Sequence, residues 1–385
     1  MMAAITAAKE NNEVTLIEKT SSLGNKIKIT GKGRCNLTFD GDLEDFKRNI
    51  VKNYKFMYSS FNNFTNKDVV SFFESHGVKT KVERGGRIFP VSDSALDIVK
   101  ALEKELKKQK VNILLNTSIK EVLTCNNIVT GIKLENGKNL ECDKCIIATG
   151  GKSFPKTGSS GDGYKLAKKL GIDIVDITPG LVPLRSNDKE VKELQGLSLK
   201  NISFKLIDET KTIYEDFGEL MFAHFGLTGP VVLSSSSVLN RIDNLKEKLQ
   251  LGKIFAIIDL KPALSFEVLD KRICRDFEKY TNKEFKNSLN DLLPQKLIPV
   301  IIKNSAIDEN KKVNQITKEE RKRLTECIKN LRVNISDLMP LEIAIITCGG
   351  INVKEINPKT MESKKISGLY FCRRNIRHRC IHWRI

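Results

Sequence analysis

The stretch KITGKGRCN, Lys28–Asn36, decides how the rest of the chain is interpreted. It places two glycines, an arginine, a thiol and an amide in one short loop, about ten residues beyond a strand that ends at Glu18. Glycine lets a backbone approach a ligand closely or adopt a positive φ, and arginine offers several donors to phosphate or carbonyl oxygens. The composition predicts a loop that contacts an anion or cofactor. An ordinary glycine-containing turn with an exposed arginine is the alternative.

The segment before this loop has the pattern of a Rossmann unit without its first strand and glycine-rich loop. Met2–Glu10 is rich in alanine and predicts a helix, and Glu13–Glu18 predicts a buried parallel strand. Its last residue, Glu18, stands where such units place the acid that binds ribose hydroxyls, although a surface glutamate at a strand end is the alternative. Only 17 residues precede Glu18, and none is glycine. Because the glycine-rich phosphate loop lies about 20 residues before the acid, we expect it and the first strand to precede Met1.

A second apolar strand runs into a glycine pair at Cys145–Gly151, CIIATGG. Such a junction brings the chain close to a dinucleotide, whereas a plain strand and turn is the alternative. Cys142 and Cys145 also form a CxxC pair, but no second pair or histidine cluster accompanies it, and metal sites take about four ligands. We therefore interpret both thiols as structural and predict no metal site.

The pattern changes near Thr178. Strand-like segments follow, among them Leu199–Ile207 and Lys253–Leu260, and residues 265–331 show helical periodicity. A strand with a glycine pair returns at Ile343–Val353. The predicted domains are a dinucleotide-binding domain in two pieces, 1–180 and 340–372, an inserted β-barrel-like plus helical domain, 181–339, and a tail, 373–385.

The loop and several later segments resemble the BaiN-like (YhiN-like) flavoproteins, FAD-dependent oxidoreductases of the two-dinucleotide-binding-domain type. The similarity runs in order along nearly the whole chain. It is carried by Leu23–Lys26 with Ile29–Asn36, and then by Arg87–Ser92, Cys145–Gly151, Gly158–Tyr164, Phe222–Pro230, Lys354–Lys364 and Gly368–Cys372.

The resemblance implies an α/β fold with a Rossmann-like FAD domain, non-covalent FAD, and hydride transfer between NAD(P)H, FAD and a small organic substrate that the sequence does not identify. The flavin carries the electrons in such chemistry, and the protein positions it. No catalytic acid or base is named; His224 is a candidate for proton transfer, but we expect it to be buried and hydrogen-bonded. The residues expected to bind the cofactor are Glu18, Lys19, Gly24, Gly31, Gly33, Arg34, Cys35, Asn36, Ile119, Ala148, Thr149, Gly150 and Gly151.

The last thirteen residues, Arg373–Ile385, depart from the family, which continues with a Gly-Glu-x-x-Asp segment and a Gly-Gly-Tyr-Asn turn. They hold five arginines and the only tryptophan of the chain. Written in AT-rich codons and read one base later, they become Glu-Glu-Ile-Leu-Asp-Ile-Asp-Ala-Tyr-Thr-Gly-Gly-Tyr. We therefore predict a frameshift after Cys372; a genuine basic tail is the alternative.

Length and composition set the remaining bounds. The 385 residues favour two or three domains, and no run reaches the roughly 20 apolar residues of a membrane span. Nine cysteines, an odd number, indicate reduced thiols and a cytoplasmic protein.

The net charge of +18 suggests a nucleic-acid partner, but the lysines are spread along the chain without interleaved aromatics. In the other reading frame the tail would lower the charge to about +9, which weakens that interpretation further. An FAD-dependent oxidoreductase is the leading hypothesis. An inactive remnant that lacks both cofactor-binding ends, and a basic nucleic-acid-binding protein, are the alternatives.

Overall fold

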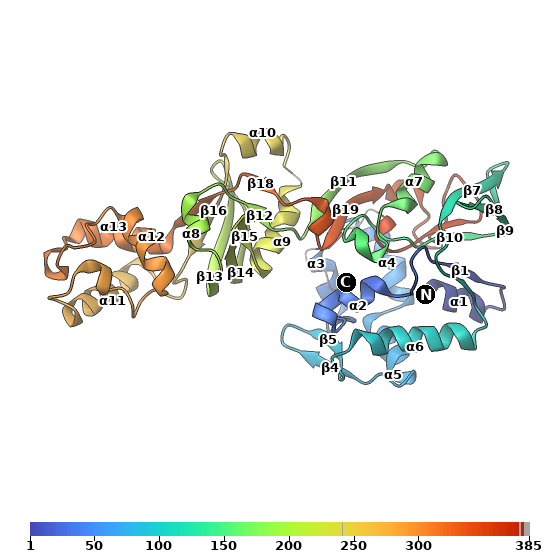
Figure 1. Ribbon diagram of the computed structural model, residues 1–385, viewed down its shortest axis with the longest axis horizontal. Coiled ribbons are helices and arrows are strands. Elements are labelled where there is room, and N and C mark those ends of the chain that lie inside the picture. The colour runs from blue at the N-terminus through green and yellow to red at the C-terminus, as the bar shows by residue number, and fades with distance from the viewer. Residues whose placement is uncertain (241, 377–378, 381–385) are drawn as a thin grey trace. The chain divides into compact units, whose positions relative to one another are not determined.

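The computed structural model describes residues 1–240, 242–376 and 379–380, and it divides into two compact units (Figure 1). Unit 1 comprises Met1–Thr178 and Leu341–Ile385, and unit 2 comprises Pro179–Pro340. Unit 1 is therefore built from two pieces of chain, and the second piece returns after the whole of unit 2 has been traversed.

Short strand pairs in unit 1 join distant parts of the sequence. A parallel pair joins β1 (Thr15–Ile17) to β6 (Asn112–Leu114), and another joins β10 (Cys145–Ile147) to β20 (Leu369–Phe371). Strand β11 (Ile174–Gly180) pairs with β19 (Ile346–Ile351). The predicted Rossmann-type α/β fold is confirmed, and the strands of the second chain piece complete it.

Two helices of unit 1 pack against each other. Helix α1 (Met2–Lys9) packs against α6 (Ala95–Lys108). Helix α6 begins at Ser94, whose hydroxyl accepts a hydrogen bond from the Leu96 backbone N–H. Its apolar positions recur at helical spacing and are buried, so that face stabilises the unit by removing apolar surface from water.

The cofactor-contact loop of the sequence analysis begins within a short helix. Helix α2 (Asn25–Ile29) follows Gly24, which has φ of +73°, and the 3-10 segment η1 (Thr30–Gly33) comes next. The chain then enters β2 (Thr38–Phe39), which pairs with β5 (Arg87–Pro90).

The remaining helices and strands of unit 1 surround these elements. Gly85 and Gly86 lie in the turn of a hairpin in which β4 pairs antiparallel to β5. The bounds are α3 (Leu43–Asn49), β3 (Ile50–Lys52), α4 (Tyr54–Asn63), α5 (Asn66–Ser75), β4 (Thr80–Glu83), β7 (Ile119–Cys125), β8 (Ile128–Leu134), β9 (Asn139–Glu141), α7 (Asp162–Lys169) and β21 (Arg379–Cys380).

Unit 2 combines a seven-stranded sheet with a helical part. The strand order is β17-β16-β13-β14-β15-β12-β18, and each neighbouring pair of strands is antiparallel. The bounds are β12 (Leu184–Arg185), α8 (Lys189–Glu193), β13 (Ser198–Asp208), β14 (Lys211–Ala223), β15 (Gly226–Thr228), α9 (Pro230–Leu239), α10 (Leu245–Gln250), β16 (Ile254–Asp259), α11 (Phe266–Lys279), α12 (Ile298–Ser305), α13 (Lys318–Lys329), β17 (Leu331–Asn334) and β18 (Asp337–Leu338).

Candidate functional site

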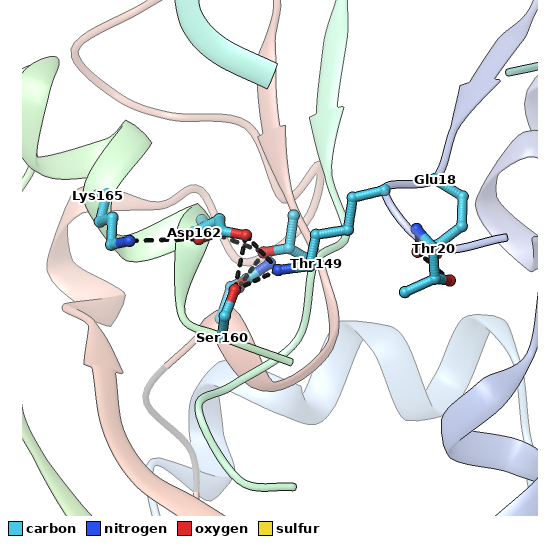
Figure 2. A network of polar contacts seen from close by, with 9 residues as sticks. Glu18, Thr20, Thr149, Ser160, Asp162 and Lys165 are labelled. Carbon is cyan, nitrogen blue, oxygen red and sulfur yellow. Dashed lines mark hydrogen bonds and ion pairs between the residues drawn. The ribbon is translucent and has the colours of Figure 1, made fainter. Parts of the chain in front are cut away.

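Glu18 lies immediately after β1, where the Rossmann pattern places an acid. Its Oε1 accepts hydrogen bonds from the Thr20 backbone N–H at 2.9 Å and from the Thr20 hydroxyl at 2.8 Å. The turn that contains Gly158 approaches this carboxylate, because a Cβ at Gly158 would lie 3.6 Å from the same oxygen. Figure 2 shows Glu18 and Thr20 beside the polar cluster at the start of α7. Thr20 therefore fixes the orientation of the predicted ribose-binding acid.

Lys19 joins the segment after β1 to the start of α7 through an ion pair. Its Nζ lies 2.6 Å from an oxygen of Asp162, the first residue of α7, and also contacts the Ser160 hydroxyl. Ser160 donates to the same carboxylate at 2.7 Å, and Lys165 lies 3.5 Å from its other oxygen (Figure 2). Burial opposes ionisation of Asp162, but the hydrogen bonds from Lys19 and Ser160 hold its pKa below the ordinary value. Asp162 thus remains a carboxylate that links β1 to α7.

The glycine-pair segment Ala148–Gly151 follows β10 and is held by a polar network. The Thr149 hydroxyl donates to Asn375 Oδ1 at 3.1 Å and accepts from the Gly163 backbone N–H at 3.1 Å. Asn375 is fully buried, and its Nδ2 donates to the Ile147 carbonyl at 2.9 Å. Gly150 has φ of +77°. A Cβ at Gly151 would lie 2.4 Å from the Thr347 hydroxyl, so only glycine fits there.

Replacing Thr149 with valine keeps the side-chain shape but leaves the Gly163 N–H and Asn375 Oδ1 without this partner. We expect a loss of about 1 to 2 kcal/mol in the free energy of unfolding, measured by urea denaturation of the cofactor-free protein. Thr117→Val, which removes an exposed bond to the Leu115 carbonyl, should change it by less than about 0.5 kcal/mol. Equal losses from both variants would show that the Thr149 network does not stabilise the unit.

The loop around Gly31 and Gly33 has the left-handed backbone that glycine favours. Their φ values are +57° and +85°, and Cys35 also has a positive φ, of +59°. The Cys35 side chain is buried, and burial raises the pKa of its thiol above the ordinary value. Cys35 is therefore a protonated thiol at neutral pH, not a thiolate nucleophile.

Arg34 is engaged by protein carboxylates. Its guanidinium lies 2.7 Å from one Glu83 oxygen and 3.3 Å from an Asp93 oxygen. It also stacks over the ring of Phe89, with its Cζ 4.1 Å from the ring centroid. In this structure the donors that the sequence analysis assigned to a ligand attach the loop to the hairpin β4–β5.

Asn36 ends the loop with a side chain that has no partner. Its Oδ1 and Nδ2 are both buried, and neither has a hydrogen-bond partner among the described residues. Ile119, expected from the resemblance to lie near the adenine, is the first residue of β7 and is partly buried against the apolar core. Of the residues predicted to bind the cofactor, Glu18 and Lys19 lie near the start of α7. Within the described part of the chain, neither of them forms a hydrogen bond with the Asn36 side chain.

The residues present fit an FAD molecule on two observations. A carboxylate stands at the end of β1 beside a close glycine turn, and the Asn36 amide is buried with its hydrogen-bonding capacity unused. An orphaned buried amide costs about 1–3 kcal/mol, so a polar ligand at this place is physically reasonable. Glu18, Asn36 and the segment Ala148–Gly151 are the groups that would hold the cofactor.

Several structural partners in this region were not found by sequence reasoning. Asn375, Ser160 and Thr20 have no individual signature, and only the glycine-rich motif that contains Asp162 pointed toward this segment. The frameshift predicted after Cys372 stays a prediction, because residues 377–378 and 381–385 lie outside the described part of the chain. Within that tail, Arg373–Asn375 form a short 3-10 turn that carries the buried Asn375 amide.

The CxxC pair, Cys142 and Cys145, and His224 do not have the surroundings of a catalytic centre. Burial raises the pKa of the Cys142 thiol and that of Cys145, the latter to about 12. No group of three or more metal-ligating side chains occurs among the residues that the structure describes. The expectation that His224 is buried is wrong: its side chain is exposed and packs edge-on to Phe225, with ring centroids 5.0 Å apart.

The part of the chain placed by the structure contains no helix with the length and apolar character needed to cross a membrane.

The chain is similar in sequence to two named proteins, and it also matches a solved structure. A 3-dehydro-bile acid delta(4,6)-reductase from Clostridium scindens is 28% identical, over 96% of this chain and 88% of that protein. A ribosomal RNA dihydrouridine synthase from Escherichia coli is 30% identical, over 96% of this chain and 87% of that protein. A 3-ketosteroid-delta4-(5alpha)-dehydrogenase structure from Rhodococcus jostii RHA1 matches 98% of this chain and 89% of its own at 15% identity, with a TM-score of 0.47.

The model of one protein family, described as HI0933-like protein Rossmann domain, matches residues 1–374. This match and the named relatives confirm the family that the loop residues indicated, and they support the predicted class of activity, FAD-dependent oxidoreduction. The match extends over nearly the whole chain, so the protein belongs to the HI0933-like Rossmann-domain family.

Proposed function

We propose that this chain is an FAD-dependent reductase that delivers a hydride to a carbon–carbon double bond of an organic substrate, with NAD(P)H as the electron donor. The names of the two relatives, a bile acid reductase and a dihydrouridine synthase, both describe reductions. Bound flavin supplies the electron transfer, and the discontinuous unit 1 is the domain that we propose holds it.

The observation that carries this proposal is the fixed carboxylate of Glu18 after β1. Because Thr20 occupies Oε1 with two hydrogen bonds, the carboxyl group cannot rotate freely and presents its second oxygen in one orientation. A carboxylate at this point of a Rossmann unit accepts hydrogen bonds from ribose hydroxyls. The chain's own contribution is therefore to bind and orient the cofactor.

The first test is whether the purified chain binds FAD in equimolar amount, with visible absorbance that bleaches on reduction. Glu18→Ala should weaken FAD binding at least tenfold, because a charge-assisted hydrogen bond is lost. Glu13→Ala, an exposed acid at the start of the same segment, is the matched control and should leave the affinity unchanged. A well-folded wild-type chain that binds no FAD would exclude the proposed function.

Ribosomal RNA is a second candidate substrate, favoured by the 30% identity to the Escherichia coli enzyme and by the net charge of +18. The reduced protein should be reoxidised by its true substrate in single-turnover experiments. A conjugated enone and a ribosomal RNA fragment are the two probes. RNA binding that weakens steeply as salt is raised would favour the second candidate, because neutralised phosphates release counterions.

A further inference from the structure

Asn36 has an unusual hydrogen-bonding deficit. Both polar atoms of its side chain are buried, and the described residues supply neither an acceptor for Nδ2 nor a donor for Oδ1. Buried polar side chains nearly always have partners, so the amide is built for a group that the polypeptide itself does not provide.

The backbone around Asn36 is held from several sides. The Cys35 N–H donates to the Thr30 carbonyl at 3.0 Å, and the Leu37 N–H donates to the Ile88 carbonyl at 2.8 Å. Gly31 lies so close that a Cβ there would be 3.0 Å from the backbone nitrogen of Asn36 and 3.0 Å from a ring carbon of Phe89. The amide is therefore presented from an anchored loop, which lowers the entropy cost of binding a ligand.

Arg34 strengthens this anchoring. Its ion pairs with Glu83 and Asp93 and its stacking on Phe89 fix the loop two residues before Asn36 to the hairpin β4–β5. The arginine thus acts through the loop, as a positioning residue for the asparagine that follows.

The chemistry of the missing partner follows from the two unpaired atoms. A primary amide offers one donor and one acceptor side by side. Phosphate oxygens only accept, so they would leave Oδ1 unsatisfied. A planar heterocycle edge with a carbonyl next to an N–H satisfies both atoms at once, and the imide edge of the isoalloxazine ring has this arrangement.

We propose that Asn36 binds the pyrimidine edge of the flavin, donating from Nδ2 to the ring carbonyl and accepting at Oδ1 from the N3–H. This assignment rests on the proposed function. The adenine ring also presents a donor beside an acceptor, so the experiment must separate the two ends of FAD.

The test compares three cofactors by fluorescence titration of the cofactor-free, full-length protein: FAD, 3-methyl-FAD and 1,N6-etheno-FAD. The methyl group removes the imide N–H, whereas the etheno bridge blocks only the adenine edge. Wild-type protein should bind 3-methyl-FAD roughly tenfold more weakly than FAD. Asn36→Ala should abolish that discrimination and keep the wild-type ratio between FAD and etheno-FAD.

Two controls make the result specific. Asn62→Ala removes an exposed amide that donates to the Tyr58 carbonyl, and it should retain the wild-type preference for FAD. Asn36→Leu keeps the approximate size of the side chain but removes both the donor and the acceptor, and it should lose the preference as the alanine variant does; circular dichroism establishes that each variant is folded.

Discrimination against 3-methyl-FAD that survives in both Asn36 variants would overturn the assignment. Loss of discrimination against etheno-FAD in these variants would also overturn it, because Asn36 would then face adenine. A wild-type protein that binds none of the three cofactors would exclude the proposed function itself, and the assignment with it, which is a different outcome from FAD binding without discrimination.

Discussion

Gly349→Ala is expected to lower the free energy of unfolding by about 3 kcal/mol or more, through a backbone collision and backbone strain together. Gly349 lies in β19 with φ of +87°, and a Cβ there would be 2.0 Å from the Asp176 carbonyl oxygen and 2.7 Å from its carbon. Both atoms belong to the backbone of the paired strand β11, so they cannot rotate away as a side chain would. The shift of the urea denaturation midpoint, followed by circular dichroism, measures the effect.

Gly137→Ala separates the collision from the strain. Gly137 has φ of +89°, nearly the same as Gly349, but a Cβ there would meet nothing within 4 Å. This variant should lose only about 1–2 kcal/mol, the cost of a left-handed backbone for an L-residue. If the two variants lose the same amount, the close contact between β19 and β11 contributes nothing.

Glu105→Ala is expected to lower the free energy of unfolding by about 2 kcal/mol, because it breaks a largely buried charged network. Glu105 lies on α6 with only 3% of its side chain exposed, and it accepts hydrogen bonds from Gln109 at 2.9 Å and from His76 Nε2 at 3.0 Å. His76 Nδ1 donates to the Phe72 carbonyl at 2.6 Å.

The pH dependence of the free energy of unfolding provides a second test of the Glu105 network. Burial opposes ionisation of Glu105, but hydrogen bonds from Gln109 and His76 and the charge of Lys108 together hold its pKa below the ordinary value of 4.5. The stabilisation is therefore complete above pH 4.5 and is lost as the pH falls through the depressed pKa. The alanine variant should show a shallower loss of stability over that acidic range.

Glu103→Ala is the matched control, since Glu103 is a half-buried acid on the same helix. It should change the free energy of unfolding by less than about 0.5 kcal/mol and keep the wild-type acid dependence. If Glu103→Ala and Glu105→Ala have the same acid profile, the network has no role in that dependence.

The parts of the fold that local patterns specify could be predicted from the sequence. Helix α6 has a serine cap and apolar residues at helical spacing, and the hairpin β4–β5 has a glycine pair between two short strands. Both are decided by residues that are neighbours in the sequence. Strand β10 and its glycine pair were predicted for the same reason.

The contacts within the candidate site depend on residues that are distant in sequence, and a single sequence does not reveal them. Lys19 forms a hydrogen bond with Asp162, which is 143 positions away in the sequence. Thr149 forms one with Asn375, which is 226 positions away. Arg34 was expected to bind a ligand because a guanidinium group suits anions. In the fold it forms ion pairs with Glu83 and Asp93 instead. Similarly, His224 was expected to be buried, but Phe222 is buried while His224, two positions on and past the end of β14, is exposed.

The strand pair β10–β20 has a consequence for how the protein is made in the cell. The contact between Ile147 and Asn375, next to this pair, spans 228 positions, and the whole of unit 2 lies between them. Ribosomes add about 5–20 residues per second, so on the order of ten to fifty seconds pass between the synthesis of β10 and that of β20. During synthesis, unit 2 can fold while the nascent unit 1 still has an open sheet edge, and that edge is exposed to wrong pairing until the last strands emerge.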